Sequence, residues 1–328
     1  MVHRHFGIDI GKPSFQVCFL FKYTILQKTF SNDEKGWSEL IIWAKELCPR
    51  AILRFCVEHT GGYETGLVTH LQAQGLYVSV VDSERIFHFR RSLGKKGKSD
   101  PGDAYCLARY SRERMPEAWC PRPDPFVAHL QLCRARDGFV EQLVRLQNKA
   151  SAPNVLAMVR DQLDMLIAVT KLAIENVEEQ MAKLESNTKE LGEAVEILRS
   201  IKGVEITSAR QIVSEMGPIS SYPTPEKLAL AAGLVPLARK SGTSLNKTEL
   251  FPYGNQKLRS AAYRVALVAK RYDPAFKAFA ERIKSHGHKS KKTVITACAR
   301  KLMHIVWALL TYKRAYDPEH LMKEARLT

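Results

Sequence analysis

The run His5-Phe6-Gly7-Ile8-Asp9-Ile10-Gly11-Lys12 decides the fold, because it is a strand pattern that contains one acid. Large apolar residues alternate with small or polar ones, which predicts a buried β-strand over residues 6–10. A carboxylate on an otherwise apolar central strand is costly unless it is paired or binds a metal. Asp9 is therefore the first candidate site residue.

The elements that follow this strand predict an α/β domain. Further strands are expected at 15–21 and 24–30, hairpin-connected to the first, followed by a helix at 34–47 with Asn32 or Asp33 as its cap, a buried strand at 51–58, a helix at 65–74 and a strand at 77–81. Antiparallel strands first and parallel ones afterwards is the order of an RNase H-like sheet, which belongs to the α/β layer architectures.

Three more acids occupy positions that such a sheet would bring together. Glu58 ends the strand at 51–58, and Asp100 and Asp103 lie three residues apart at the start of a helix expected over 103–114. Taken singly, Asp9 can be a strand-end acid, Asp100 an N-cap and Asp103 a first-turn acid. Jointly, they predict a divalent metal site, because Mg²⁺ prefers carboxylate oxygens together with substrate phosphate and water.

The charge balance predicts a polyanionic partner. The chain has 328 residues, which suggests about two domains, and its 50 basic and 34 acidic residues give a formal charge of +16. Such an excess indicates nucleic acid, because Lys and Arg displace counterions from phosphates, although a basic protein without such a partner is the alternative. The basic residues within 84–98 fit either a solvated loop or a segment that contacts a nucleic-acid backbone.

The cysteines and the hydropathy predict a cytosolic protein. The seven cysteines form no C-x-x-C pair, which favours reduced, buried thiols over disulfides or a zinc site. The N-terminus lacks the apolar core of a signal peptide, and no run of about eighteen apolar residues predicts a membrane-spanning helix. We therefore expect a cytoplasmic protein without a membrane partner.

The rest of the chain is expected to be mostly helical. Helical pattern runs over 127–150, and a seven-residue series begins at Leu156 and continues through Leu163, Thr170, Val177, Leu184, Leu191 and Leu198. A companion series three residues on comprises Val159, Leu166, Ala173, Gln180, Asn187, Ala194 and Ile201. This heptad pattern predicts a long helix of coiled-coil type, with polar Gln180 and Asn187 in its seam, that pairs either within the chain or between subunits.

Three parts result: a metal-binding domain at 1–125, a helical or coiled-coil region at 126–198 and a mainly α-helical domain at 199–328. In the last part, helices are expected at 207–216, 225–232, 256–271, 274–284 and 293–312, with a polar irregular or hairpin segment at 239–254 and a basic loop at 284–292.

The ordered motifs resemble the DEDD insertion-sequence transposases, a family that includes Piv-type DNA invertases and bridge-RNA-guided recombinases. The similar segments are Gly7-Ile8-Asp9-Ile10-Gly11-Lys12, Val57-Glu58-His59-Thr60-Gly61-Gly62-Tyr63, Lys98-Ser99-Asp100-Pro101-Gly102-Asp103-Ala104 and Leu230-Ala231-Ala232-Gly233-Leu234-Val235-Pro236, with Ser241-Gly242-Thr243-Ser244 after the last. Each motif is short, but the set spans nearly the whole chain in the family's order.

The resemblance implies a fold, a mechanism and partners. It implies a RuvC-like N-terminal domain in which Asp9, Glu58, Asp100 and Asp103 bind Mg²⁺, with Mn²⁺ as an alternative. It implies that Ser241 attacks a DNA phosphodiester and forms a transient phosphoserine link. It further implies donor and target DNA, a structured guide RNA in some relatives, a homodimer that assembles into a tetramer on DNA, and a nucleoid-associated protein of a bacterium or archaeon.

Other interpretations stay open on the residues alone. Ser241 and Ser244 lie in a Gly-containing polar stretch, where serines are often turn residues, and Ser244 is the second candidate nucleophile. A RuvC-type, structure-specific endonuclease would use metal-activated water instead of a serine. A nucleic-acid-binding scaffold with a degenerate RNase H-like domain is the non-enzymatic alternative.

Overall fold

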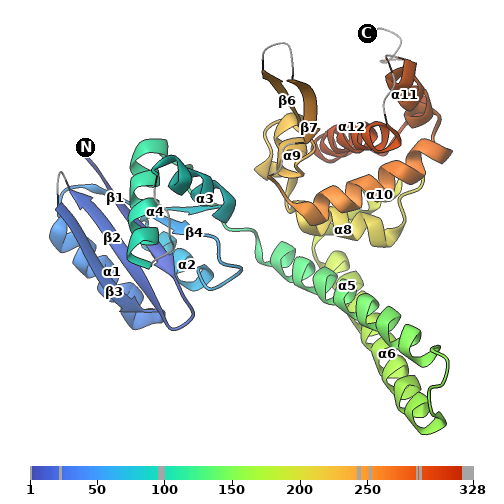
Figure 1. Cartoon of the computed structure of the whole chain (residues 1–328), viewed down its shortest axis with the longest axis horizontal. Coiled ribbons are helices and arrows are strands. Elements are labelled where there is room, and N and C mark those ends of the chain that lie inside the picture. The colour runs from blue at the N-terminus through green and yellow to red at the C-terminus, as the bar shows by residue number, and fades with distance from the viewer. Residues whose placement is uncertain are drawn as a thin grey trace. The chain divides into compact units, whose positions relative to one another are not determined.

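The computed structural model describes residues 2–21, 24–94, 100–241, 245–250, 253–285, 287 and 290–319, with the backbone alone at 100–101, 238–241 and 245–249. The chain divides into two compact units, Met1–Pro121 and Arg122–Thr328, which are described separately below (Figure 1). The further division at residue 198 stays a prediction.

The first unit contains a five-stranded mixed sheet. Its strands are β1 (His3–Ile10), β2 (Ser14–Phe21), β3 (Thr24–Ser31), β4 (Ile52–Glu58) and β5 (Tyr77–Val81). The order is β3-β2-β1-β4-β5, with the first three strands antiparallel and β4 and β5 parallel to β1. The predicted strands and the predicted change from antiparallel to parallel pairing are confirmed, and the arrangement is compatible with an RNase H-like domain.

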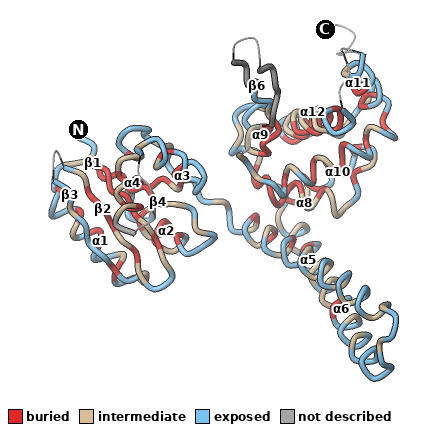
Figure 2. The backbone as a smooth tube through the Cα atoms, viewed as in Figure 1, coloured by how far each residue is buried: buried red, intermediate tan, exposed pale blue. Residues whose placement is uncertain are grey.

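One face of this sheet is buried by two helices, α1 (Glu34–Leu47) and α2 (Thr65–Ala73). The α1 helix starts at the predicted cap, where the Asp33 carboxylate accepts a hydrogen bond from the Gly36 N–H at 2.9 Å. The core on this face contains Phe6 and Ile8 of β1, and Figure 2 shows the burial along the central strands. Alternation along a strand therefore directs Gly7 and Asp9 to the opposite face.

That opposite face is covered by α3 (Ser83–Ser92) and α4 (Asp100–Arg114). The prediction of a loop over the first part of 84–98 is wrong, because Ser83–Ser92 is helical, whereas 95–99 lie outside the described residues. The Asp82 carboxylate caps α3 by accepting from the Glu84 N–H at 2.9 Å. Ile86 and Phe89, three residues apart among the basic side chains, are buried against the sheet and hold the helix there.

The second unit begins with a helical hairpin of α5 (Asp124–Ala150) and α6 (Ala157–Asn187). The predicted series through Leu163, Thr170 and Val177 does lie on the less exposed side of α6. The single long helix is wrong, however, since α6 ends at Asn187 and a separate helix, α7 (Lys189–Arg199), carries the last residues of the series.

The predicted companion series is also wrong within α6. Val159 and Leu166 are 46% and 50% exposed, and Gln180 and Asn187 are exposed rather than in a seam. The second inward series lies four residues after the first and includes the fully buried Met181. α6 therefore carries two apolar stripes, of which one packs against α5 and the other faces outward.

The remaining helices share one core with α12 (Lys291–Thr311), whose buried residues lie between Val294 and Leu310 (Figure 2). They are α8 (Ile206–Met216), α9 (Pro225–Ala231), α10 (Gln256–Tyr272) and α11 (Pro274–Ser285), with a 3-10 turn at Ile219–Ser221. In the described part of the chain, α12 alone is long and apolar enough to cross a membrane, but it contributes ten buried residues to this core.

A two-stranded hairpin projects from this core between α9 and α10. It consists of β6 (Pro236–Ser241) and β7 (Leu245–Leu250), paired antiparallel with Ser241 opposite Leu245. The sequence left the segment at 239–254 as either irregular or a hairpin, and the structure shows the hairpin. Ser241 is the last residue of β6.

Candidate active site

Asp9 and Glu58 lie side by side at the edge where β1 and β4 end. The parallel register pairs Gly7 with Cys56 and Ile8 with Val57, so that the next residue of each strand is the acid. Phe55 and Val57 face the α1–α2 core, which leaves Cys56 and Glu58 on the face that α4 covers. Both carboxylates are partly exposed on that same face.

The packing of α4 brings Asp103 to the same place. A methyl group on Gly7 would stand 2.1 Å from both the Ala104 carbonyl oxygen and the Ala108 amide nitrogen, so the α4 backbone rests directly on β1. Farther along α4, the Ser111 hydroxyl lies 2.9 Å from Nδ1 of His5. The helix thus runs antiparallel to β1, and its first turn lies at the level of Asp9.

The environment of His5 beneath α4 disfavours the protonated form of its imidazole. Burial, assisted by the nearby charge of Arg54, lowers the pKa of His5 to about 4. The imidazole is therefore neutral near neutral pH and serves as a hydrogen-bond partner of Ser111, which ties β1 to α4.

Asp103 is buried, and its partner is a residue that the sequence did not indicate. It forms an ion pair with Arg90 of α3, whose side chain is 16% exposed against 3% for Asp103. Arg90 belongs to the basic run at 84–98, and no spacing rule connects it with an acid thirteen residues later. The contact arises only because α3 and α4 pack side by side on the sheet.

The donor set suits a hard divalent cation, since it consists of carboxylates gathered on one face at one edge. Asp9, Glu58 and Asp103 are brought to that face, whereas the side chain of Asp100 is not among those described. Within the described residues, no three His, Cys, Asp or Glu side chains form a group ready to hold a metal ion. Asp103 is engaged by Arg90 in this structure.

The candidate nucleophiles belong to the second unit. The backbone of Ser241 ends β6, and its side chain is outside the described set, as is all of Ser244. The structure therefore places the Ser241 backbone near the tip of a hairpin, and its role as a nucleophile stays a prediction.

Comparison with known proteins defines the class of the chain. Residues 6–157, which include all four acids, match a DEDD-type transposase family model. Residues 195–281, which include Ser241, match the model of the IS116/IS110/IS902 transposase family.

Full-length relatives then define the family. The pilin gene-inverting proteins of Moraxella bovis and Moraxella lacunata are each 31% identical to the chain over 321 residues, which cover 97% of this chain and 98% of each relative. A 42 kDa protein of insertion element IS900 from Mycobacterium paratuberculosis is 22% identical over an alignment of 387 positions, which covers 95% of this chain and 96% of the relative.

The chain belongs to the IS110-type transposase and invertase family. Members of this family cleave and rejoin DNA strands, so the protein is a DNA recombinase with DNA as its substrate. The DEDD family also implies use of a divalent metal.

Proposed function

We propose that Asp9, Glu58, Asp100 and Asp103 bind Mg²⁺, or Mn²⁺ in its place, within a RuvC-like domain, and that Ser241 is the nucleophile of DNA cleavage. The observation that carries the metal site is the parallel register of β1 and β4, which sets Asp9 beside Glu58 on the face covered by α4. Asp103 enters that face from the first turn of α4.

In the proposed reaction, the Ser241 hydroxyl oxygen attacks a DNA phosphorus. The bond from that phosphorus to one bridging oxygen breaks, and the released DNA end takes up a proton. The phosphoserine link keeps the phosphoester for a second displacement, in which a hydroxyl of the partner strand attacks the phosphorus and Ser241 is restored. A divalent ion bound by the four acids would supply stabilisation of the negative charge that develops on the phosphate oxygens.

The four acids belong to the first unit and Ser241 to the second. For the relatives in Moraxella, the name states inversion of a pilin gene. We propose the same kind of strand exchange here, between a donor and a target site. A structured guide RNA is a further proposed partner, supported by the charge of +16.

A dimer is also proposed, through the outward stripe of α6. Met158, Met165, Val169 and Leu172 are 72%, 60%, 60% and 56% exposed and recur at helical spacing. Apolar side chains in such a row favour a second copy of the same helix, as in coiled coils. Two dimers would then form the tetramer on DNA, in a protein that we place at the nucleoid in the cytoplasm of a bacterium or archaeon.

The test is recombination of a donor and a target plasmid, together with trapping of a protein–DNA adduct. Wild type is compared with Asp9→Ala, Ser241→Ala and the neighbouring control Ser244→Ala. We expect both recombination and the adduct to require Asp9 and Ser241, and Ser244→Ala to keep both. Normal recombination by Ser241→Ala would overturn the covalent mechanism, and cutting without any adduct would favour a RuvC-type endonuclease that uses water.

A further inference from the structure

The β6–β7 hairpin leaves the helical core and returns to it at a single place. Gly233 precedes the hairpin and Gly254 follows it, and both have a positive φ, +64° and +114°. A methyl group on Gly233 would lie 2.3 Å from the Tyr253 carbonyl oxygen, and one on Gly254 would lie 2.6 Å from the Gly233 nitrogen. The segments on either side of the hairpin, 231–233 and 253–254, which we call its feet, therefore touch backbone to backbone.

Three hydrogen bonds close these feet. The Asn255 N–H donates to the Ala231 carbonyl at 2.7 Å. The Arg259 guanidinium donates to the Ala232 carbonyl at 3.1 Å and to the Tyr253 carbonyl at 3.2 Å. Residues before and after the hairpin are thus held by two residues of the next segment.

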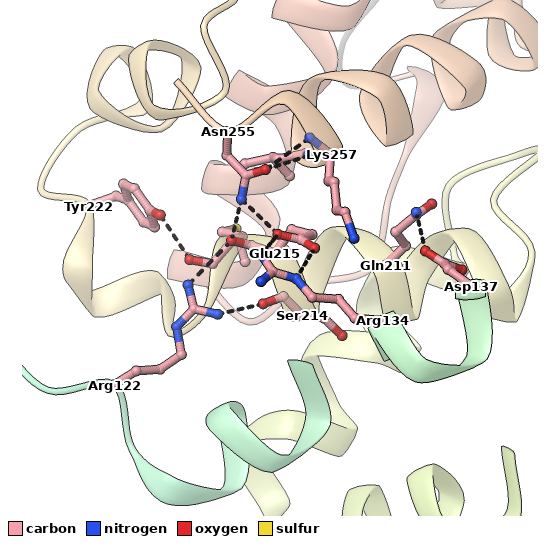
Figure 3. Close-up of polar contacts among 11 residues, drawn as sticks. Arg122, Arg134, Asp137, Gln211, Ser214, Glu215, Tyr222, Asn255 and Lys257 are labelled. Carbon is pink, nitrogen blue, oxygen red and sulfur yellow. Dashed lines mark hydrogen bonds and ion pairs between the residues drawn. The ribbon is translucent and has the colours of Figure 1, made fainter. Parts of the chain in front are cut away.

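Asn255 links these feet to a buried acid. Its amide nitrogen donates to Oε2 of Glu215 at 2.8 Å and to the Glu215 carbonyl at 3.3 Å (Figure 3). Its amide oxygen caps α10, accepting from the N–H groups of Lys257 and Leu258 at 3.0 and 3.1 Å. Asn255 therefore holds the feet of the hairpin through its backbone N–H, and it holds the start of α10 and the end of α8 through its side chain.

Glu215 extends this link to α5. It is 4% exposed, and both its carboxylate oxygens accept from the Arg134 guanidinium, at 3.0 and 2.9 Å (Figure 3). Burial alone would raise the pKa of Glu215, but the hydrogen bonds from Arg134 and Asn255 outweigh it and hold the pKa below its usual value. Glu215 is therefore charged at neutral pH and joins α5, α8 and the hairpin.

We propose that Glu215 is a positioning residue for Ser241, acting through Asn255 to fix the feet of the β6–β7 hairpin against α5. This inference rests on the proposed role of Ser241. A misplacement of about 1 Å at a reacting group costs on the order of 10²-fold in rate. Glu215 itself makes no contact with DNA in this account, so its loss should affect the rate of attack and leave DNA affinity unchanged.

Two variants release the hairpin while keeping the fold. Glu215→Gln removes the charge that holds Arg134, and the Arg134 side chain, 49% exposed, can turn to solvent. Asn255→Ser keeps an N-cap for α10 but is too short to reach Glu215. Both should loosen the feet of the hairpin without unfolding the second unit.

Glu185→Gln is the matched control. Glu185 is also a carboxylate with little exposure, 11% of its side chain, and it accepts from two nitrogens of the Arg210 guanidinium, at 2.7 and 2.8 Å, and from His129 at 2.9 Å. It joins α5, α6 and α8 but does not contact the feet of the hairpin. The control therefore removes a comparable ion pair from the same unit.

The experiment measures single-turnover formation of the protein–DNA adduct at saturating DNA, DNA affinity and thermal stability. We expect adduct formation to slow by about 10- to 100-fold in Glu215→Gln and Asn255→Ser, at unchanged affinity, and to keep its wild-type rate in Glu185→Gln. Equal slowing in the control, or no slowing in the two variants, would overturn the proposal.

Amide hydrogen exchange over the described residues of β6 and β7 keeps the test independent of the serine chemistry. We expect faster exchange in Glu215→Gln than in Glu185→Gln, and equal exchange would overturn the positioning role. If wild type forms no adduct, or Ser241→Ala still forms one, the nucleophile is wrong, while the exchange result still decides whether Glu215 holds the hairpin.

Discussion

Replacing Gly7 by Ala should separate α4 from the sheet. The new methyl group would stand 2.1 Å from two backbone atoms of α4, whereas contacts below 3.0 Å are not tolerated, so the helix has to move outward by about 0.9 Å. Overpacking of this kind costs about 1–3 kcal/mol, and the reduced freedom of the unfolded chain returns about 0.4–1 kcal/mol. We therefore expect a net loss of about 1–2 kcal/mol in the free energy of unfolding.

The assay is denaturant unfolding followed by tryptophan fluorescence. Three of the four tryptophans, Trp37, Trp43 and Trp119, lie in the first unit, so the signal reports mainly on it. The matched control is Gly138→Ala in α5, where a methyl group would meet nothing within 4 Å. Because that glycine lies in the second unit, the control should leave the unfolding midpoint of the first unit unchanged.

A Gly7→Ala midpoint at or above that of wild type would refute the direct packing of α4 on β1. The same variant should lose most metal-dependent recombination, because a displacement of about 1 Å at Asp103 is enough to cost on the order of 10²-fold in rate.

Three further predictions concern His5, Arg90 and α6. The free energy of unfolding should decrease as the pH is lowered from 6.5 to about 4, because His5 has its ordinary pKa in the unfolded chain and a pKa of about 4 in the folded protein. Unfolding midpoints should depend less on pH in His5→Gln than in wild type, and equal dependence would contradict this. Arg90→Gln should destabilise the first unit by about 3–5 kcal/mol in the absence of metal. Mg²⁺ should restore more stability to this variant than to wild type, since Arg90 no longer engages Asp103, and equal restoration in denaturant titrations would show that Arg90 does not compete. Leu172→Lys should weaken self-association in sedimentation measurements, whereas Lys171→Glu, at an exposed position away from this row on the same helix, should not, and equal effects would remove α6 from the dimer contact.

The sheet was predictable because its strands alternate in hydropathy. Phe6, Ile8 and Ile10 mark the buried face of β1, and the acids Asp9 and Glu58 interrupt apolar strands at their ends. These local patterns are sufficient to give both the strands and the face on which the acids lie.

The parts that were missed depend on tertiary contacts. In α3, Ile86 and Phe89 are spaced as on a helix, but surrounding basic residues conceal the pattern, and the pairing of Arg90 with Asp103 follows only from packing. On α6, two apolar stripes compete, and which one faces α5 is decided by the hairpin rather than by the series itself. Glu215 was missed because its partners come from α5 and from beyond the β6–β7 hairpin.

The distribution of thiols makes the protein ready for site-selective labelling. Six of the seven cysteines are buried, and Cys120 alone is exposed, one residue before the end of the first unit. Burial raises the pKa of the thiols of Cys56 and Cys133, which keeps them protonated and unreactive. A maleimide dye or spin label should therefore attach at Cys120 in the native protein without removal of the other cysteines, and would report on the segment at the end of the first unit.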